Sequence, residues 1–343
     1  YLLIFILQSA SAGFTPTFQA TIPDVLPDEK DYTRALSLSR LAYDMESLVS
    51  PILAAALLGI MSFHWLFSGT AIGFACSALL VLSVTLPRTE AQAPGGGIYD
   101  KTTRGTRHYL KTPRLRGLLA VTLAAAAASA MVIVNTPVLV RGALGLGQSE
   151  VAITLAAFGG GSMIAALLLP KLLDRISDRA VMLVAAAAMT LFLALLSAAW
   201  SLEGGLHLWP IILAGWFALG LSYSASITPG GRLLRRSSGA EDRPALFAAQ
   251  FALSHVCWLI AYPLAGQVGA RAGMGMALAA SAVLALAGTL IAWRIWPRED
   301  PDILAHSHDD LPSDHPHLRE GHAEGETRHA FVIDELHPNW PGR

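Results

Sequence analysis

The chain has 343 residues, a formal net charge of −1 at pH 7 and 53% hydrophobic residues, with a mean hydropathy of +0.49. This composition is too apolar for a soluble protein of this size and is typical of a protein with many membrane spans. The two cysteines, Cys76 and Cys257, both fall inside apolar segments, so a disulfide framework and a cysteine-based metal site are unsupported.

Nine apolar segments are long enough to cross a membrane as helices, because a hydrocarbon core about 30 Å thick needs roughly 20 residues per helix. In chain order they lie near residues 1–20, 37–60, 65–86, 117–140, 150–170, 180–200, 208–228, 245–268 and 272–296. The segments 117–140 and 180–200 contain no Asp, Glu, Lys or Arg. We therefore expect an all-α membrane protein with nine spans.

Lysine and arginine alternate between the two sides of this predicted bundle. They gather near residues 30–40, 87–116, 171–179, 232–243 and 294–298, whereas the intervening loops hold only Arg141 and Arg271. Short loops rich in basic residues stay in the cytoplasm. We therefore expect a multi-pass protein of the cell inner membrane, with its first residue outside and its C-terminus cytoplasmic.

The chain begins at Tyr1 within apolar sequence, without Met or the charged start of a signal peptide, and we interpret it as an N-terminally truncated fragment. Three predicted spans precede the large basic loop and six follow it. We expect the last three helices of an N-terminal half (1–86), a basic cytoplasmic loop between the halves (87–116), a six-helix C-terminal half (117–297) and an acidic, histidine-rich cytoplasmic tail (298–343).

Three loop segments carry patterns of a known transporter family. One branch of the major facilitator superfamily, related to siderophore and multidrug exporters, has a connection between its fourth and fifth helices that residues 20–27 (Ala-Thr-Ile-Pro-Asp-Val-Leu-Pro) with 34–36 (Arg-Ala-Leu) resemble. The start of the seventh helix in the same branch is similar to residues 108–116 (His-Tyr-Leu-Lys-Thr-Pro-Arg-Leu-Arg). The superfamily's Asp-Arg loop signature, linked to conformational change, is similar to a set of four residues: Asp174, Arg175, Asp178 and Arg179. The resemblance implies a bundle of two six-helix halves, of which helices 4 to 12 are present.

Two patterns of proton-coupled members are incomplete. Residues 5–9 (Phe-Ile-Leu-Gln-Ser) lack the arginine that precedes a Gln-Gly pair in the fourth helix of many exporters. Residues 50–55 keep the small side chains of the fifth-helix antiporter motif but not its glycines. Small side chains still permit close helix approach, and Pro51 still removes one backbone hydrogen bond. These departures weaken the expectation of proton antiport.

Ionisable side chains are rare within the predicted spans and are functional candidates, because burying a charge in hydrocarbon costs several kcal/mol. Asp44 and Glu46 lie in the second span, and Arg40 lies one helical turn before Asp44. Either Arg40 and Asp44 form a structural ion pair, or Asp44 or Glu46 exchanges a proton during transport. His255 is either a core histidine bonded to a neighbouring helix or a residue of the substrate cavity.

Hydroxyl groups and glycines are frequent in the span 208–228, which includes Tyr223. We include Tyr223 among the residues of the coupling site or substrate cavity, with helix packing as the alternative role for this span. The run Gly159-Gly160-Gly161 has the same alternatives of close packing or a flexible point.

The tail 298–343 has low hydrophobicity and excess acidic charge, which predicts disorder. It holds many histidines, and imidazole and carboxylate groups favour divalent zinc, nickel, cobalt or copper. The candidate metal ligands are His306, His308, Asp309, Asp310, His315, His317, His322, His329 and His337. The alternative is an acidic tail that binds no metal. We expect the more apolar segment 331–336, with Trp340, to dock on the cytoplasmic face.

Enzymatic and ATP-driven functions have little support, because no phosphate-binding Gly-Lys-Ser/Thr loop and no Ser, His and Asp grouping stands out in the sequence. We expect a secondary transporter that exports a small molecule by alternating access, with protons as the coupling ion. One alternative is a divalent metal exporter (nickel, cobalt or zinc) that uses the histidine-rich tail, which is similar to the tails of nickel-resistance members of the superfamily. Another is a membrane metal sensor or scaffold that does not transport. The expected partners are the lipid bilayer and a small-molecule or metal-ion substrate, with no nucleic acid and no cofactor except divalent metal ions at the tail.

Overall fold

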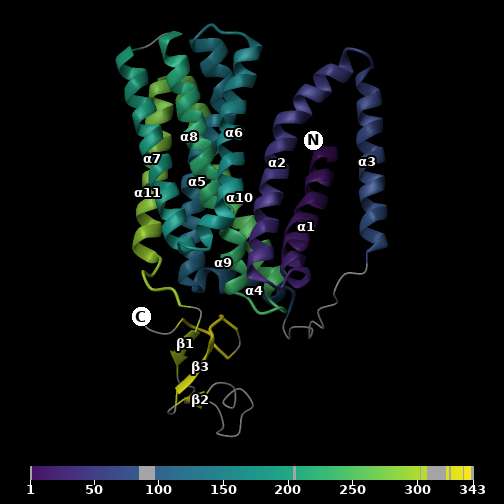
Figure 1. Cartoon of the computed structure of the whole chain (residues 1–343), viewed down its shortest axis with the longest axis vertical. Coiled ribbons are helices and arrows are strands. Elements are labelled where there is room, and N and C mark those ends of the chain that lie inside the picture. The colour runs from purple at the N-terminus through teal and green to yellow at the C-terminus, as the bar shows by residue number, and fades with distance from the viewer. Residues whose placement is uncertain are drawn as a thin grey trace.

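The computed structural model describes residues 2–84, 97–203, 206–301, 303–306, 322–323, 326–334 and 336–340, and within them the chain is mostly helical (Figure 1). The first three helices and the helix after them are α1 (Leu2–Val25), α2 (Glu29–Leu58), α3 (Phe63–Ser83) and α4 (Ile98–Lys111). The remaining elements of the helical part are α5 (Pro113–Pro137), the π-helix η1 (Val138–Ala143), α6 (Gln148–Leu173), α7 (Asp178–Glu203), the 3-10 turn η2 (Leu206–Leu208), α8 (Trp209–Ile227), α9 (Gly230–Arg236), α10 (Arg243–Ala272) and α11 (Met274–Ile295).

Seven of the described helices are long and apolar enough to cross a membrane, so the expected count of nine is not matched. They begin with α3 and include α5 with η1, α6, α7, α8 with α9, α10 and α11. Two helices at predicted spans lie outside this set, α1 and α2, and they contain polar side chains that lower their hydropathy. Gln8 and Gln19 interrupt α1, while Arg40, Asp44 and Glu46 interrupt α2.

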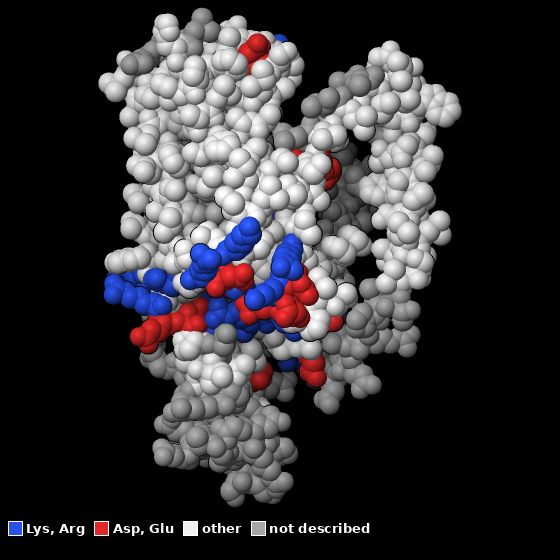
Figure 2. All heavy atoms as spheres, in the orientation of Figure 1, with Lys and Arg blue, Asp and Glu red and all other residues white. Residues whose placement is uncertain are grey.

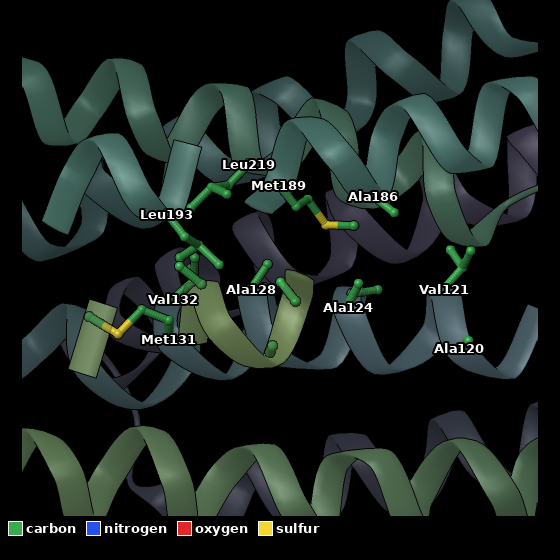
Figure 3. Packing of buried hydrophobic residues seen from close by; sticks show 14 of the residues in the cluster. Ala120, Val121, Ala124, Ala128, Met131, Val132, Ala186, Met189, Leu193 and Leu219 are labelled. Carbon is green, nitrogen blue, oxygen red and sulfur yellow. The ribbon is translucent and has the colours of Figure 1, made fainter. Parts of the chain in front are cut away.

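The helices α5, α6, α7, α8, α10 and α11 pack against one another in a bundle. The helices α1, α2 and α3 stand beside it (Figure 1). Within the bundle, α5 is the most enclosed helix, with its small and apolar side chains buried against α7, α8 and α11. Figure 3 shows Ala124, Ala128 and Met131 of α5 facing Met189 and Leu193 of α7. The run of alanines lets neighbouring backbones approach closely. Membrane helices depend on such close packing, because the hydrophobic effect does not drive them together within lipid.

Two glycines set the contact between α6 and α8. A Cβ atom added at Gly161 would lie 2.0 Å from the carbonyl oxygen of Phe217, and one at Gly220 would lie 1.9 Å from that of Phe158. Each glycine therefore admits the backbone of the opposite helix. The packing interpretation of the glycines in these spans is confirmed at both positions, whereas nothing lies within 4 Å of a Cβ at Gly160.

Charged side chains gather at one end of the molecule, where α4, α9 and the tail lie (Figure 2). We call this the charged end; it comprises residues 24–34, 104–116, 174–179, 232–243 and 298–300. Here α1 packs on α10, and α2 packs on α6. At the opposite end the surface is notched between the bundle and α2 and α3 (Figure 2).

Residues 98–111 of the predicted basic loop form a helix, α4, that packs on α10. A Cβ at Gly105 would lie 2.2 Å from the carbonyl oxygen of Ala245, so this glycine permits the two helices to touch. Tyr109 is fully buried, and its hydroxyl donates to the side-chain oxygen of Gln250. The predicted loop between the halves is therefore anchored to α10.

The prediction of disorder is wrong for part of the tail. The strands β1 (Ile303–His306), β2 (His322–Ala323) and β3 (Glu326–Ala330) form an antiparallel sheet in the order β1-β3-β2. Pairing between segments distant in sequence supplies backbone hydrogen bonds that composition alone does not reveal.

The segment that follows β3 docks on the junction of α4 and α5, as expected from its apolar side chains. Phe331 is 3% exposed and its ring lies 5.2 Å from that of Trp340. The guanidinium of Arg114 lies over the Trp340 ring at 5.2 Å, and Nζ of Lys111 donates to the carbonyl oxygen of Pro338 over 2.9 Å. The tail is thus fastened to the charged end by aromatic and cationic contacts.

Candidate functional site

A buried polar cluster joins α2 to α6. Arg40 and Asp44 are one turn apart on α2, with Nη2 of Arg40 2.5 Å from Oδ1 of Asp44 and its Nε donating to Oδ2 over 3.2 Å. Ser162 of α6 donates to Oδ2 of Asp44 over 2.5 Å and accepts from Nε of Arg40 at 3.2 Å. Asp44 is 4% exposed and Ser162 is fully buried. The carboxylate is therefore held by donors from two helices.

Aromatic rings enclose the Arg40 guanidinium. Its Cζ lies 5.2 Å from the centroid of the Tyr43 ring and 4.9 Å from that of Tyr223 on α8. Phe158 of α6 packs against Tyr223, with 5.6 Å between ring centroids. Cation–π contacts stabilise a guanidinium most where water is scarce. We call Arg40, Asp44, Ser162 and Tyr223 the buried cluster, with the exposed Tyr43 at its edge; it connects α2 with both α6 and α8.

Glu46 and His255, two further candidates from the sequence, lie outside the buried cluster, and both side chains are exposed. Nδ1 of His255 lies 2.7 Å from the carbonyl oxygen of Phe251, one turn earlier on α10, and the two rings are 4.2 Å apart. The interpretation of His255 as a core histidine bonded to a neighbouring helix is wrong, because its bond lies within its own helix. Its role in a substrate cavity stays a prediction.

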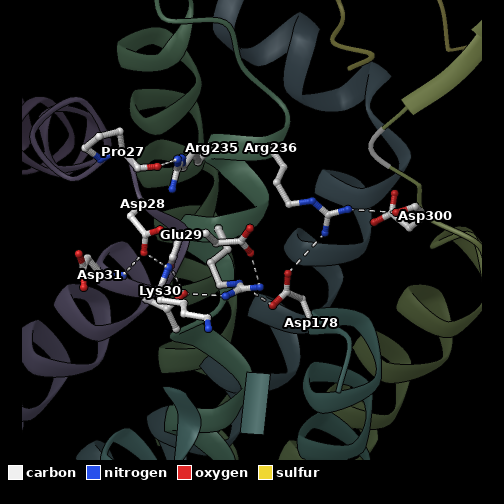
Figure 4. A network of polar contacts seen from close by, with 11 residues as sticks. Pro27, Asp28, Glu29, Lys30, Asp31, Asp178, Arg235, Arg236 and Asp300 are labelled. Carbon is white, nitrogen blue, oxygen red and sulfur yellow. Dashed lines mark hydrogen bonds and ion pairs between the residues drawn. The ribbon is translucent and has the colours of Figure 1, made fainter. Parts of the chain in front are cut away.

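A second polar network joins α2 to α7 and α9 at the charged end (Figure 4). The carboxylate of Asp178, at the start of α7, lies 3.0 Å from Nε of Arg232 and 3.5 Å from Nη1 of Arg236. Arg232 also reaches α2, where its Nη2 lies 2.5 Å from Oε1 of Glu29 and its Nη1 donates to Oγ1 of Thr33 over 2.6 Å. We call these five residues the inter-half network, because α2 precedes the loop 87–116 and α7 and α9 follow it.

Arg236 extends this network toward the tail. Its Nη2 donates to the carbonyl oxygen of Asp300 over 3.0 Å. The Asp300 carboxylate in turn lies 3.0 Å from Nε of Arg114, which is 1% exposed, and accepts from Nε1 of Trp296 at 3.3 Å. One chain of polar contacts therefore runs from α2 through α9 to the first residues after α11.

The four residues of the Asp-Arg loop signature have different surroundings. Asp178 is the member that enters the inter-half network. Arg179 donates to the carbonyl oxygens of Trp293 and Trp296 over 3.4 and 3.3 Å and so holds the end of α11. Asp174 and Arg175 are exposed and make no ion pair with any residue that the structure describes.

Two further ion pairs fasten α10 at the charged end. Arg243 pairs with Asp24 of α1, and Asp242 pairs with Arg104 of α4 at 3.1 Å. Nδ1 of His108, also on α4, lies 3.7 Å from Oδ2 of Asp242. Burial lowers the pKa of His108 despite the opposing effect of the Asp242 carboxylate. His108 is therefore neutral near pH 7.

The predicted metal ligands of the tail are only partly described. Those outside the described residues are His308, Asp309, Asp310, His315 and His317. His306, His322 and His329 lie on strands, and the register sets both His306 and His322 opposite Thr327.

His337 is buried, with its Nδ1 2.8 Å from Oδ1 of Asp334 and its ring 4.8 Å from that of Phe331. It contributes to the docked segment of the tail. In the described part of the chain, no three His, Cys, Asp or Glu residues are arranged to hold one metal ion.

Sequence reasoning missed six of the residues in and beside the two clusters: Glu29, Thr33, Tyr43, Ser162, Arg232 and Arg236. The single local signal for Ser162 is its position directly after the glycine run, at a point where helices approach closely. Glu29 and Thr33 lie in the first turns of α2. In that region the basic residues predict only which side of the membrane the loop faces. The partners of Ser162, Glu29 and Thr33 come from helices more than a hundred residues away, so spacing in the sequence gives no indication of the contacts.

Comparison with protein families gives one match. The model described as Major Facilitator Superfamily matches residues 1–202 and 118–314, which together reach from the first helix into the tail. No curated protein matches the chain.

Proposed function

Because the chain belongs to the major facilitator superfamily, whose members are membrane transporters and not enzymes, we propose that it exports a small molecule as a secondary transporter by alternating access. The observation that carries the proposal is the inter-half network. It closes the charged end between α2 and the α7–α9 region, while at the opposite end the surface is notched between the bundle and α2 and α3 (Figure 2).

Alternating access needs contacts that break and re-form as the two halves move. Glu29 suits this role, because its side chain is 58% exposed and its pair with Arg232 is open to water. Exposed ion pairs contribute only about 0–1 kcal/mol, so this contact can be exchanged at low cost. The buried side of the network, at Asp178, stays within the second half.

We propose that α1 and α2 cross the membrane together with the seven apolar helices, as helices 4 and 5 of the superfamily. The packing of α1 on α10 and of α2 on α6 supports this assignment. The arginines of the charged end favour a cytoplasmic location for that end and for the tail, in an inner membrane. The loop patterns near residues 20–36 and 108–116 support membership of the siderophore and multidrug branch.

For coupling, we propose that Asp44 takes up a proton when the halves move. Ser162 belongs to the second half and Asp44 to the first, so separation of α6 from α2 removes one hydrogen-bond donor from the carboxylate. Movement of the halves therefore changes which donors the carboxylate contacts. Glu46, Tyr223 and His255 remain candidates for the cavity that the substrate enters.

Growth of cells carrying the full-length gene on a panel of drugs, siderophores and divalent metals tests the function. We expect resistance to one class of compound, and loss of resistance in Asp44→Asn at unchanged membrane abundance. A full-length protein that alters growth on none of these compounds, and drives no substrate across reconstituted liposomes, would contradict transport.

A second candidate function is export of divalent nickel, cobalt or zinc, with the tail collecting the ion. The favouring observation is the strand register, which sets His306 and His322 opposite the same residue of β3. Replacing His306, His308, His315 and His317 by Ala should then abolish nickel or zinc resistance. If metal resistance persists in this variant, these histidines are not needed for export. If a protein without the tail still transports any substrate, a role as a sensor or scaffold alone is excluded.

A further inference from the structure

A small polar pocket lies at the charged end, between the first turns of α2 and the helix α9. Its volume is about 170 Å³, and it is lined by Glu29, Tyr32, Arg232, Arg235 and Arg236. Pockets for drug-sized ligands measure about 300–1,000 Å³, so this one suits a single small group such as a tetrahedral oxyanion.

Positive charge exceeds negative charge in this pocket. Three guanidinium groups line it against the single carboxylate of Glu29, which is 58% exposed. Asp178, which pairs with both Arg232 and Arg236, brings a second carboxylate to the same group of arginines. Arg235 has no carboxylate partner among the described residues, and its guanidinium donates to the carbonyl oxygen of Pro27 and lies 5.3 Å from the Tyr32 ring centroid.

Two buried donors of the pocket lack an acceptor in the described part of the protein. Tyr32 is fully buried, and its hydroxyl has no hydrogen-bond partner. Nη1 of Arg235 is likewise buried and without a partner. Leaving a buried donor unsatisfied costs about 1–3 kcal/mol, and such groups are rare in folded proteins. A Cβ at Gly231 would lie 2.8 Å from the Tyr32 hydroxyl, so the glycine lets α9 pack closely on this side chain.

We propose that this pocket binds a phosphate-type anion, which accepts hydrogen bonds from the Tyr32 hydroxyl and from Nη1 of Arg235 and offsets the excess positive charge. Guanidinium groups recognise phosphate oxygens through charge-assisted bonds. Tyr32 belongs to α2 and Arg235 to α9, so the anion bridges the two halves and stabilises the form closed at the charged end. The effect on conformation rests on the proposed transport function, whereas the binding does not.

The test measures the melting temperature of the purified full-length protein in a neutral detergent. The probes are inorganic phosphate, phosphatidylglycerol and, as a headgroup without net charge, phosphatidylcholine; sodium chloride at equal ionic strength controls for screening. At a probe concentration tenfold above Kd, the melting temperature should rise by about 2 °C or more. A rise with phosphatidylglycerol alone identifies a lipid headgroup, and a rise with inorganic phosphate identifies a free anion.

Tyr32→Phe separates two effects of the hydroxyl: its effect on the stability of the ligand-free protein and its effect on anion binding. Removing an unpartnered hydroxyl should leave the melting temperature of the ligand-free protein unchanged or raise it. The same change should reduce the anion-induced rise at least twofold. Arg235→Gln should abolish that rise. Arg175→Gln is the matched control, since it removes one exposed arginine from the same end and should keep the full effect.

Three outcomes would overturn the pocket assignment. The first is no rise with phosphate or phosphatidylglycerol, and the second is an equal rise in the Tyr32→Phe, Arg235→Gln double variant and the unmodified protein. The third is a lower melting temperature of ligand-free Tyr32→Phe, which would reveal a protein partner for the hydroxyl. A protein that binds the anion in this assay but transports nothing would instead contradict the proposed function and leave the pocket intact.

Discussion

Ser162 of α6 donates a 2.5 Å hydrogen bond to the carboxylate of Asp44 on α2, so a residue of the second half holds the buried charge of the first. The Arg40–Asp44 pair alone would be a local feature of one helix. The serine makes it a contact between two helices that the proposed alternating access would move relative to each other. This arrangement supplies the first prediction.

Asp44→Asn should destabilise the protein more than Ser162→Ala. Replacing Asp44 leaves Arg40, which is 12% exposed, without its counter-charge, and loss of one partner of a buried pair costs about 3–5 kcal/mol. Ser162→Ala removes one hydrogen bond to a charged group, worth about 1.5–3 kcal/mol. Thermal denaturation of the purified variants measures both effects.

A double-mutant cycle decides whether the pair acts as a unit. Arg40→Gln combined with Asp44→Asn should cost less than the sum of the single changes, because neither charge is then left alone. Additive costs would mean that Arg40 and Asp44 are stabilised independently by their other contacts.

The sequence predicts part of this cluster and not the rest. Arg40 and Asp44 are four residues apart on a helix, a spacing that brings side chains together regardless of the fold. Ser162 and Tyr223 come from other helices, and their contact depends on the close approach that Gly161 and Gly220 allow between α6 and α8. Such pairings are decided by tertiary packing.

For the fold too, the sequence predicts what local composition decides and not what tertiary packing decides. The helices α5, α6, α7, α8, α10 and α11 follow from the length and apolar composition of their segments, because the bilayer sets both. The helix α4 was missed because it is short and mostly polar: Gly105 and Tyr109 contact α10, while few of its other residues are apolar. The tail sheet was missed because strand pairing joins residues far apart in a polar segment.

Asp178→Asn should shift the conformational equilibrium toward a form open at the charged end. Asp178 pairs with Arg232 and Arg236, and Arg232 in turn contacts Glu29 and Thr33 on α2. Without the carboxylate, Arg232 is no longer positioned to hold α2. We expect the open population to rise about tenfold, equivalent to about 1.4 kcal/mol.

Spin labels at two exposed positions can measure this shift. Cysteines replacing Arg34 on α2 and Ile176 before α7, in a protein without Cys76 and Cys257, report the distance between the halves. Glu241→Gln is the control, because Glu241 is exposed and makes no ion pair with the described residues. Identical distance distributions in Asp178→Asn and the control would show that the network does not hold the halves together.

Stability should fall as the pH drops below about 6.5, in part because of His108. Burial lowers the pKa of His108 in the folded protein below its ordinary value of 6.5. Between the two pKa values the unfolded state binds more protons than the folded state, so the free energy of unfolding decreases as the pH falls through this window. His108→Gln removes this contribution, and the variant should lose less melting temperature between pH 7.5 and pH 5.5 than the unmodified protein. Equal losses would mean that His108 does not titrate on unfolding.

Trp340→Ala should release the tail from the charged end. The Trp340 ring contacts both Phe331 and the guanidinium of the buried Arg114, and aromatic pairs and cation–π contacts contribute about 0.5–1.5 kcal/mol each. Arg114 keeps its ion pair with Asp300 in the variant, so the helical bundle should retain its melting temperature.

Limited proteolysis of the purified protein measures this release, since cleavage of a docked segment depends on its transient opening. Cleavage after β3 should become about tenfold faster, which is what a loss of about 1.4 kcal/mol of docking free energy produces. Leu336→Ala is the control, because Leu336 is 39% exposed in the same docked segment. Equal cleavage rates in Trp340→Ala and the unmodified protein would mean that Lys111 and the strand pairing hold the tail without the aromatic contacts. Faster cleavage accompanied by a lower melting temperature of the bundle would assign Trp340 a role in the fold of α4 and α5 as well.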